Sequence, residues 1–471
     1  RFPEAYWGIP AGGTGVLNAH AVDAGGSTFA VPTLNVGAGG AACAGTKFNG
    51  ATIGCYDGDA TFTGSYSFGA EAPVLRASTV DGAAADITLQ GVPTATARIA
   101  KTGAGALTLV EPAGTFALNT ASVPAKDSAL ASVPADGAAP PDASNVENGS
   151  VAAAGLQILS GAVRVKGAGR DATTVKSEQS VFVGTPYAPA AEAGLEIADC
   201  TYVADGTARA TVLATGTTSA GFAAPYLTLR AAAYVSHRLK LGAGAPTVDV
   251  YPTATMVDAT VTFESGFDIG CASDKVHPRL LLDNTQVTQY RTGYAEGHRF
   301  YRDFAVTLTN GALLNATYTA GAGNSWHGLR FENGAWGTLR VTAGSKVQTS
   351  RIESLNTGAT DEKHVEVVFD GGTLEMTADA SGAEAKTAFR RAGGAGLHRD
   401  GRGHGGPAGG RRHAHVRDAV PGRRCRDEDG RGHDGARRRG GRQARLPGDG
   451  RRGAAGGRPR SGWEARLGEG K

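Results

Sequence analysis

The stretch that most constrains the fold is Lys101–Leu109, which joins a Gly-x-Gly turn to a short strand of alternating apolar and polar residues. Leu107 and Leu109 share one face of this strand, because successive side chains of a β-strand point to opposite faces. A strand this short cannot form a core alone and has to stack on similar strands. The motif therefore predicts one turn of a repetitive β-structure. Its defining residues are Lys101, Thr102, Gly103, Gly105, Leu107 and Leu109.

Composition supports the same class of fold. Glycine accounts for 71 of the 471 residues, roughly double its ordinary share. So much glycine suits many short strands joined by corners that need a positive φ, and it does not suit a helical protein. The sequence has no apolar run of 18 residues or more, so we expect no helix that spans a membrane.

A recurring strand start gives the period of the repeat. Asp or Asn precedes a short strand at Asp258, Asp283, Asn310, Asn333 and Asp370, with a drifting spacing of about 25 residues and one longer interval. A β-sandwich would show turns every 8–12 residues, and such turns also occur here. The longer period favours an all-β solenoid, which we expect to be a right-handed parallel β-helix with irregular loops.

Two compositional breaks divide the chain. We expect residues 1–120 to form the N-terminal part of the β-helix and 150–387 to continue it. Between them, residues 121–149 are rich in Pro and Ala, a composition that cannot bury a core and indicates a loop insertion. Residues 388–471 form a Gly/Arg-rich tail with 22 Lys and Arg against 9 Asp and Glu.

The tail has two competing interpretations. Its composition is that of a disordered basic segment, which would bind nucleic acid if it is genuine. Alternatively, the tail is translated out of frame, because codons for Asp427–Arg437 read one base later are compatible with a second copy of the 101–109 motif. In that case the tail has no function, and the gene should encode further strand repeats in the shifted frame. We expect no nucleic-acid partner for the rest of the chain.

Residues 101–109 resemble the KTGAGTLTL opening of the passenger-associated strand repeat of autotransporter-type and other bacterial surface proteins. Residues 155–165 are similar to the closing half of that repeat. The two segments cover about 25 residues, and the Pro/Ala-rich insertion splits the unit. The resemblance implies a β-helical passenger that is secreted or attached to the cell surface. The chain begins Arg1-Phe2-Pro3 without Met or a signal peptide, so we expect a mature form or a fragment.

Two cysteines flank a hairpin signal. Cys43 and Cys55 lie on either side of Asn49-Gly50, a dipeptide typical of two-residue hairpin loops. A disulfide between them would need a one-residue bulge, for which Gly54 is available. We weigh this disulfide equally against two reduced cysteines.

Charged side chains concentrate between residues 274 and 303. On neighbouring turns of a β-helix they would line one groove, where basic and acidic groups together suit a polysaccharide lyase or a glycosidase. The catalytic candidates are Lys275, Arg279, Glu296, Arg299 and Asp303. The competing interpretation is a solvated charged face, which is the more common role of such runs.

Aromatic side chains supply the binding candidates. Exposed Trp and Tyr rings stack on sugars, although a strand Trp is more often part of a core. These candidates are Tyr290, Tyr294, Trp326 and Trp336. The Cys and His spacing matches no metal site, and we expect neither a metal nor a cofactor.

The sequence thus predicts a secreted or surface-attached β-helical protein. We expect an adhesin or structural passenger that presents loops to host or matrix glycans or proteins. The alternative is a β-helical polysaccharide lyase or glycosidase. Convergence of the 274–303 side chains in one cleft would favour the enzyme.

Overall fold

The computed structural model describes most of the first 377 residues and three short segments beyond them. The described ranges are 6–8, 15–30, 33–48, 52–68, 74–91, 93–95, 99–118, 154–177, 180–184, 192–204, 210–216, 225–244, 246–289, 297–317, 328–355, 363–377, 389–391, 398–399 and 413–417. The chain divides into two units, Arg1–Gly422 and Arg423–Lys471, of which the second lies wholly outside these ranges.

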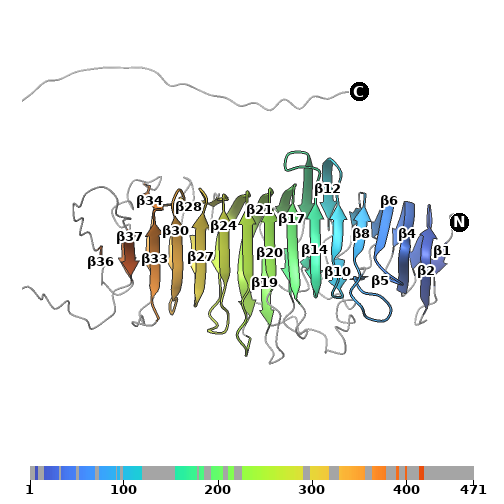
Figure 1. Ribbon diagram of the computed structural model, residues 1–471, viewed down its shortest axis with the longest axis horizontal. Coiled ribbons are helices and arrows are strands. Elements are labelled where there is room, and N and C mark those ends of the chain that lie inside the picture. Colours follow the sequence, from blue (N-terminus) through green and yellow to red (C-terminus); the bar gives the residue numbers. More distant parts are fainter. Residues whose placement is uncertain are drawn as a thin grey trace, which may run out of the picture. The chain divides into compact units, whose positions relative to one another are not determined.

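The first unit is a parallel β-helix, as the repeat predicts. Strand β11 (Leu107–Val110) pairs in parallel with β8 (Ile87–Gln90) on one side and with β14 (Gly161–Lys166) on the other. The same relationship recurs along the unit, and the strands lie side by side in chain order (Figure 1). No helix is found among the described residues, so none of them belongs to a helix able to cross a membrane.

The described strands form three parallel ladders, one for each side of a helical turn. The first ladder contains β5 (Thr52–Cys55), β7 (Val74–Arg76), β10 (Ile99–Thr102), β13 (Ala154–Ile158), β16 (Ser180–Val183), β19 (Ala210–Gly216), β26 (Gly297–Phe300), β29 (Leu329–Phe331), β32 (Ile352–Ser354) and β35 (Phe389–Arg391). The second contains β8, β11, β14, β17 (Ala193–Ala198), β20 (Tyr226–Arg230), β22 (Thr253–Val257), β24 (Arg279–Asp283), β27 (Phe304–Thr309), β30 (Gly337–Thr342) and β33 (Val365–Asp370).

The third ladder contains β1 (Tyr6–Gly8), β3 (Thr28–Ala30), β9 (Pro93–Ala95), β12 (Gly114–Leu118), β15 (Thr173–Ser177), β18 (Thr201–Ala204), β25 (Gln286–Gln289), β28 (Leu313–Ala316), β31 (Lys346–Thr349) and β34 (Thr373–Met376). Longer strands turn a corner and contribute to more than one ladder; they are β2 (Val16–Asp23), β4 (Thr33–Phe48), β6 (Ala60–Phe68), β21 (Ala233–Gly244) and β23 (Thr260–Ile269).

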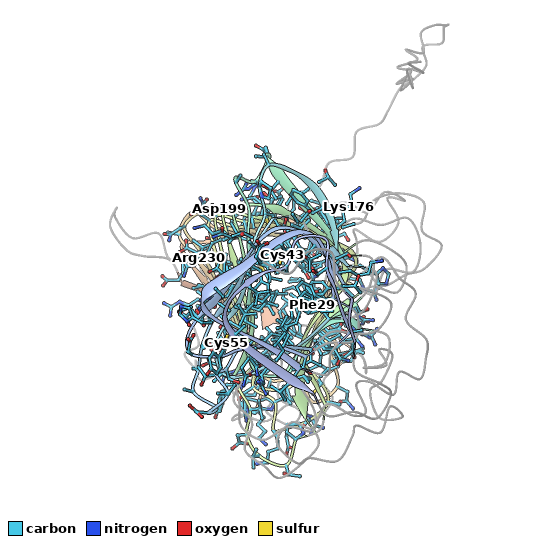
Figure 2. All side chains as sticks on the ribbon, turned by 90° about the vertical axis from the view of Figure 1, so that its right-hand side faces the viewer. Phe29, Cys43, Cys55, Lys176, Asp199 and Arg230 are labelled. Atoms are coloured by element: carbon cyan, nitrogen blue, oxygen red, sulfur yellow. The ribbon has the colours of Figure 1, made fainter. Side chains whose placement is uncertain are left out.

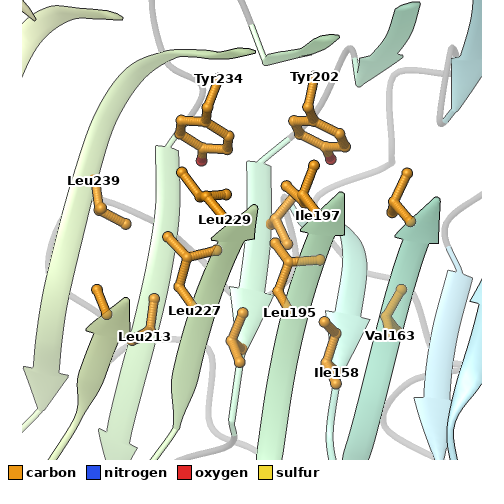
Figure 3. Close-up of a cluster of buried hydrophobic side chains, with 14 of the residues drawn as sticks. Ile158, Val163, Leu195, Ile197, Tyr202, Leu213, Leu227, Leu229, Tyr234 and Leu239 are labelled. Atoms are coloured by element: carbon orange, nitrogen blue, oxygen red, sulfur yellow. The ribbon is translucent and has the colours of Figure 1, made fainter. Parts of the chain in front are cut away.

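The core consists of inward side chains that stack on the same residue position of the next turn. Leu195 of β17 pairs with Leu227 of β20 in register, and both are buried. The rings of Tyr202 and Tyr234 stack with centroids 5.8 Å apart (Figure 3). Each turn therefore buries its apolar face against its neighbours, which is how a solenoid stabilises strands too short to fold alone.

Residues 101–109 form a corner held by a buried lysine. Leu107 and Leu109 point into the core as predicted, and Lys101 is completely buried. Its Nζ donates to the carbonyl oxygens of Gly103 (2.6 Å), Ser160 (2.7 Å) and Gly105. Burial lowers the pKa of Lys101 to about 7. Three converging acceptors nevertheless favour the charged ammonium, because a neutral amine has only two N–H groups to donate.

The Asp and Asn residues of the repeat occupy the corner after the second ladder. Asp258, Asn284 and Asn310 all adopt a positive φ there, which Asn and Asp tolerate better than other side chains. Asn284 Nδ2 donates to Asp258 Oδ1 of the preceding turn at 2.7 Å, 26 residues away in sequence. The repeat predicted from the sequence therefore corresponds to one turn of the β-helix. Asn333 is the exception, since it precedes β30 and lies in a different corner.

The hairpin expected around Asn49-Gly50 is wrong, although that dipeptide itself lies outside the described residues. Strands β4 and β5 pair in parallel, with Val36 opposite Cys55, and Cys43 lies opposite Gly64 of β6. The two cysteines therefore sit at different positions of the helical turn (Figure 2), and both are free and buried. Burial raises the pKa of each thiol to about 11. The Cys43–Cys55 disulfide is not formed in this structure.

Three short strands lie within the segment that the sequence assigns to the tail. Strand β35 pairs in parallel with β32, so the first ladder extends to Arg391. Strand β37 (His413–Arg417) pairs antiparallel with β33 and with β36 (His398–Arg399). The other tail residues and the insertion at 121–149 lie outside the described residues, and the shifted reading frame stays a prediction.

Candidate functional site

The candidates from the sequence separate into two clusters on neighbouring sides of the helix. Lys275, Arg279 and Asp303 come together at the corner before the second ladder, whereas Arg299 lies on the first ladder. Trp336 lies at the same corner as the first cluster. The remaining candidates, Tyr290, Tyr294, Glu296 and Trp326, lie outside the described residues.

Register places five side chains on consecutive turns at this corner. The strand residues Thr253, Arg279, Ala305, Thr338 and Glu366 are successive partners across β22, β24, β27, β30 and β33. The residue two positions before each of them occupies the corner. These residues, which we name the corner row, are Tyr251, His277, Asp303, Trp336 and His364.

His277 is the centre of an ionic network in the corner row. It is buried, and its Nδ1 forms a short contact with Asp303 Oδ2. Its Nε2 lies 3.2 Å from Asp249 Oδ1, close enough for an ion pair but without hydrogen-bond geometry. Lys275 Nζ also donates to Asp249 Oδ1, at 3.1 Å. The nearby His277 and Lys275 together hold the pKa of the Asp249 carboxyl below its usual range.

Arg279 binds the other carboxylate and approaches an exposed aromatic ring. Its Nη1 donates to the Asp303 carbonyl oxygen at 2.7 Å, and Nη2 lies 3.4 Å from Asp303 Oδ2. Its guanidinium carbon lies 5.5 Å from the centre of the Tyr251 ring. The His277 ring stacks on Tyr251 with centroids 4.8 Å apart. Tyr251 is nevertheless 48% exposed, one of the few large hydrophobic side chains so open to solvent.

The second half of the corner row is built around Trp336. The Trp336 ring is half-buried, and Lys363 Nζ lies 5.6 Å from its centre. Two residues earlier, Gly334 has φ +75°, and a Cβ placed there would lie 3.2 Å from Arg302 Nε. The Arg302 guanidinium therefore rests on the Asn333–Gly334 turn, which leads into Trp336.

Arg299 belongs to a separate and closed ion-pair cluster. Its Nε and Nη2 donate to the two oxygens of Asp268 at 2.8 and 3.1 Å. Arg238 donates to the same carboxylate at 3.0 Å. The Asp268 side chain is only 7% exposed, so its oxygens are occupied and covered. This geometry suits a buried structural cluster rather than a reacting group.

The convergence at the corner row does not have the geometry of general acid–base catalysis. A general base needs a nitrogen or oxygen within reach of a substrate proton. His277 Nε2 is buried, its Nδ1 is bonded to Asp303, and Asp303 Oδ2 also faces Arg279. Acidic and basic groups thus converge as the enzyme hypothesis requires, but they neutralise one another. Among the described residues, no group of His, Cys, Asp and Glu has the arrangement of a metal site.

The sequence identified part of this site and missed part of it. The polar run from 274 to 303 contained Lys275, Arg279 and Asp303, and Trp336 was a binding candidate. Asp249, Tyr251 and His364 were not singled out as site residues, whereas His277 and Arg302 belong to the polar run but were not among the catalytic candidates. One available signal was the pair of X-Pro sequences at Tyr251-Pro252 and His277-Pro278, since a residue before proline is extended and often begins a strand.

Comparison with known proteins does not assign a family to the chain. No family model matches it, and neither does any curated protein or solved structure that was searched.

Proposed function

We propose that the chain is a secreted or surface-attached β-helical protein that binds extracellular glycans along the corner row. The observation that carries this proposal is the placement of Tyr251 and Trp336 in one line, with polar side chains on the turns between them. Sugar binding in proteins commonly combines an aromatic surface with fixed hydrogen-bonding groups. The corner row supplies the aromatic surface, and the exposed side chains of Asp249 and Lys275 beside it supply polar groups held by their ion pair.

The spacing of the row suits an extended polymer. Neighbouring strands of a ladder lie about 4.8 Å apart, so Tyr251 and Trp336, three turns apart in register, are separated by about 14 Å. That distance corresponds to a short oligosaccharide segment lying along the helix axis. The intervening His277 and Asp303 are fixed by the ion pairs with Asp249 and Arg279, so they are already in place before a ligand arrives.

The geometry favours binding over cleavage. A lyase or glycosidase would need an accessible base or acid at the row, whereas His277 Nε2 is covered and Asp303 is engaged by two partners. We therefore keep the adhesin or structural-passenger role as the proposed function. The resemblance of residues 101–109 to passenger repeats of bacterial surface proteins supports this role and the extracellular location.

The proposal is tested by binding the full chain to a panel of immobilised polysaccharides from extracellular matrices. Wild type should bind at least one of them, and the double variant Tyr251→Ala/Trp336→Ala should lose most of that binding. Tyr56→Ala is the matched control, because Tyr56 is also exposed but lies far from the row in sequence and turn number. Unchanged binding by the double variant would contradict the proposal.

A further inference from the structure

Resting on the proposed function, we infer that the glycan is acidic and that Arg302, beside Trp336, binds its carboxylate. The ligand class is a polysaccharide containing uronic acid. The inference depends on the pairing state of Arg302, on the turn that supports it and on the charge balance of the corner row.

Arg302 differs from the other arginines around it. Arg279, Arg299, Arg330, Arg340 and Arg351 each pair with a carboxylate within 3.4 Å. Arg302 is half-buried and makes no hydrogen bond or ion pair with any residue in the described part of the chain. Its guanidinium donors are therefore available to an anionic ligand, with which they could form charge-assisted hydrogen bonds.

The Arg302 guanidinium lies against the Asn333–Gly334 turn, which leads into Trp336. Because Gly334 has no side chain, Arg302 Nε comes within 3.2 Å of the position that a Cβ would occupy. Phe304, two residues after Arg302, donates its backbone N–H to the Trp336 carbonyl oxygen at 3.1 Å. The turn and this bond fix Arg302 and Trp336 relative to each other. A sugar ring on Trp336 would therefore have its substituents near the guanidinium.

The pairing of the charged side chains differs between the two ends of the corner row. At the Tyr251 end, Asp249 is paired with Lys275, and Asp303 is paired with His277 and Arg279. Those groups offer hydrogen bonds but little net charge. At the Trp336 end, Arg302 has no carboxylate partner in the described part of the chain. An acidic sugar is therefore best accommodated at the Trp336 end.

The chemistry of the guanidinium gives this site its selectivity. Arg presents a planar fork of donors that matches a carboxylate with two parallel hydrogen bonds, and it keeps its charge at all relevant pH values. Charge-assisted hydrogen bonds contribute about 1.5–3 kcal/mol, which corresponds to roughly 10- to 100-fold in affinity. A neutral sugar of the same shape cannot form these charge-assisted hydrogen bonds and should bind more weakly.

The test compares acidic polysaccharides with their carboxyl-reduced forms, in which each uronate becomes the neutral sugar of the same configuration. The full chain is titrated with polygalacturonate, alginate and hyaluronan and with the reduced form of each. We expect at least one acidic form to bind about tenfold more tightly than its reduced counterpart, with an affinity that falls as salt rises.

Variants separate the role of Arg302 from a general charge effect. Arg302→Gln should abolish the difference between acidic and reduced forms while leaving the weaker binding of the reduced form intact. Arg302→Lys should retain only part of the difference between acidic and reduced forms. Arg230→Gln is the matched control, because Arg230 is an exposed arginine at the other end of the second-ladder strands, outside the row. The Arg230→Gln variant should keep the full preference for the acidic over the reduced polysaccharide.

The outcomes distinguish this inference from the proposed function. Equal binding of acidic and reduced forms, or an unchanged preference in Arg302→Gln, overturns the inference and leaves glycan binding in place. Binding of neither form, together with no binding to any member of the polysaccharide panel, overturns both.

Discussion

The rings of Tyr251 and His277 stack with centroids 4.8 Å apart, although 26 residues separate them in the sequence. Their contact exists because β22 and β24 are adjacent turns in parallel register, which puts the residues before each strand side by side. Asp303 extends the same line on the next turn. A binding surface of this kind is a property of the helical register and not of any continuous motif.

His277 should contribute to stability as well as to the site. It is buried between two carboxylates, so His277→Ala should lower the free energy of unfolding by about 1–3 kcal/mol. His20→Ala is the control, since His20 pairs with Asp57 at 2.6 Å on an exposed surface and should cost less than about 1 kcal/mol. Urea denaturation of the two variants measures the difference. Equal losses would show that the His277 network is no more than a surface ion pair.

Replacing Lys101 by Met should be strongly destabilising. The substitution keeps the length of the side chain but leaves three carbonyl acceptors in a buried corner without their donor. We expect a loss of about 2 kcal/mol or more. Lys176→Met on the exposed face of β15 should change the unfolding midpoint little. A Lys101→Met protein as stable as wild type would contradict the proposed role of this lysine.

Gly161 should tolerate alanine much less well than Gly82. Both have a positive φ, so both substitutions incur the backbone cost of about 1–2 kcal/mol for a left-handed conformation. A Cβ at Gly161 would also lie 2.2 Å from Lys101 Nζ and 2.3 Å from the Gly105 carbonyl oxygen, whereas nothing lies within 4 Å at Gly82. Thermal unfolding of both variants isolates the steric part. The thermal unfolding midpoint of Gly161→Ala must be clearly lower than that of Gly82→Ala.

Stability should fall on mild acidification because of His298. Burial lowers the pKa of this histidine to about 4, from an ordinary value of 6.5. The unfolded chain therefore binds more protons than the folded chain between these values, and up to about 3 kcal/mol should be lost as the pH falls from 6.5 to 4. His298→Leu should remove this part of the pH dependence. Parallel pH curves for wild type and variant would refute the assignment.

Glu111 should act in the opposite direction. Its side chain is buried with neither carboxyl oxygen hydrogen-bonded, and burial raises its pKa to about 7. The folded chain then holds a proton that the unfolded chain releases above its pKa of 4.5, so stability should decrease as the pH rises from 4.5 through 7. Glu111→Gln should gain stability relative to wild type over that range. A constant difference between the two proteins would argue against a neutral Glu111.

The parts of the fold that the sequence predicted were those encoded locally. Leu107 and Leu109 alternate with Thr108, and that pattern alone determines which side chains point inward. Asp258 and Asn310 marked corners because few other residues adopt a positive φ. The hairpin predicted from Asn49-Gly50 was wrong for a related reason. The dipeptide favours a tight turn between antiparallel strands, but β4 and β5 on either side of it pair in parallel, through the start of β4 at Thr33–Val36.

The candidate site was less predictable because its members are distant in sequence. Tyr251 and Trp336 are 85 positions apart, and only the register of four strands shows that they share a corner. Arg299 and Arg279 looked alike in the charged run. Their separation follows from strand position, since β26 belongs to the first ladder and β24 to the second. Neither fact is visible in composition or spacing.

Hydroxyl-radical footprinting with mass spectrometry is the most direct measurement of the central claim, because it reports which side chains a bound glycan covers. The full chain would be oxidised alone and with a saturating acidic polysaccharide from the panel. We predict that Tyr251, Trp336 and His364 become protected, while the exposed Tyr56 is oxidised equally in both samples. Protection confined to residues outside the corner row, with Tyr251 and Trp336 oxidised as before, would contradict the account.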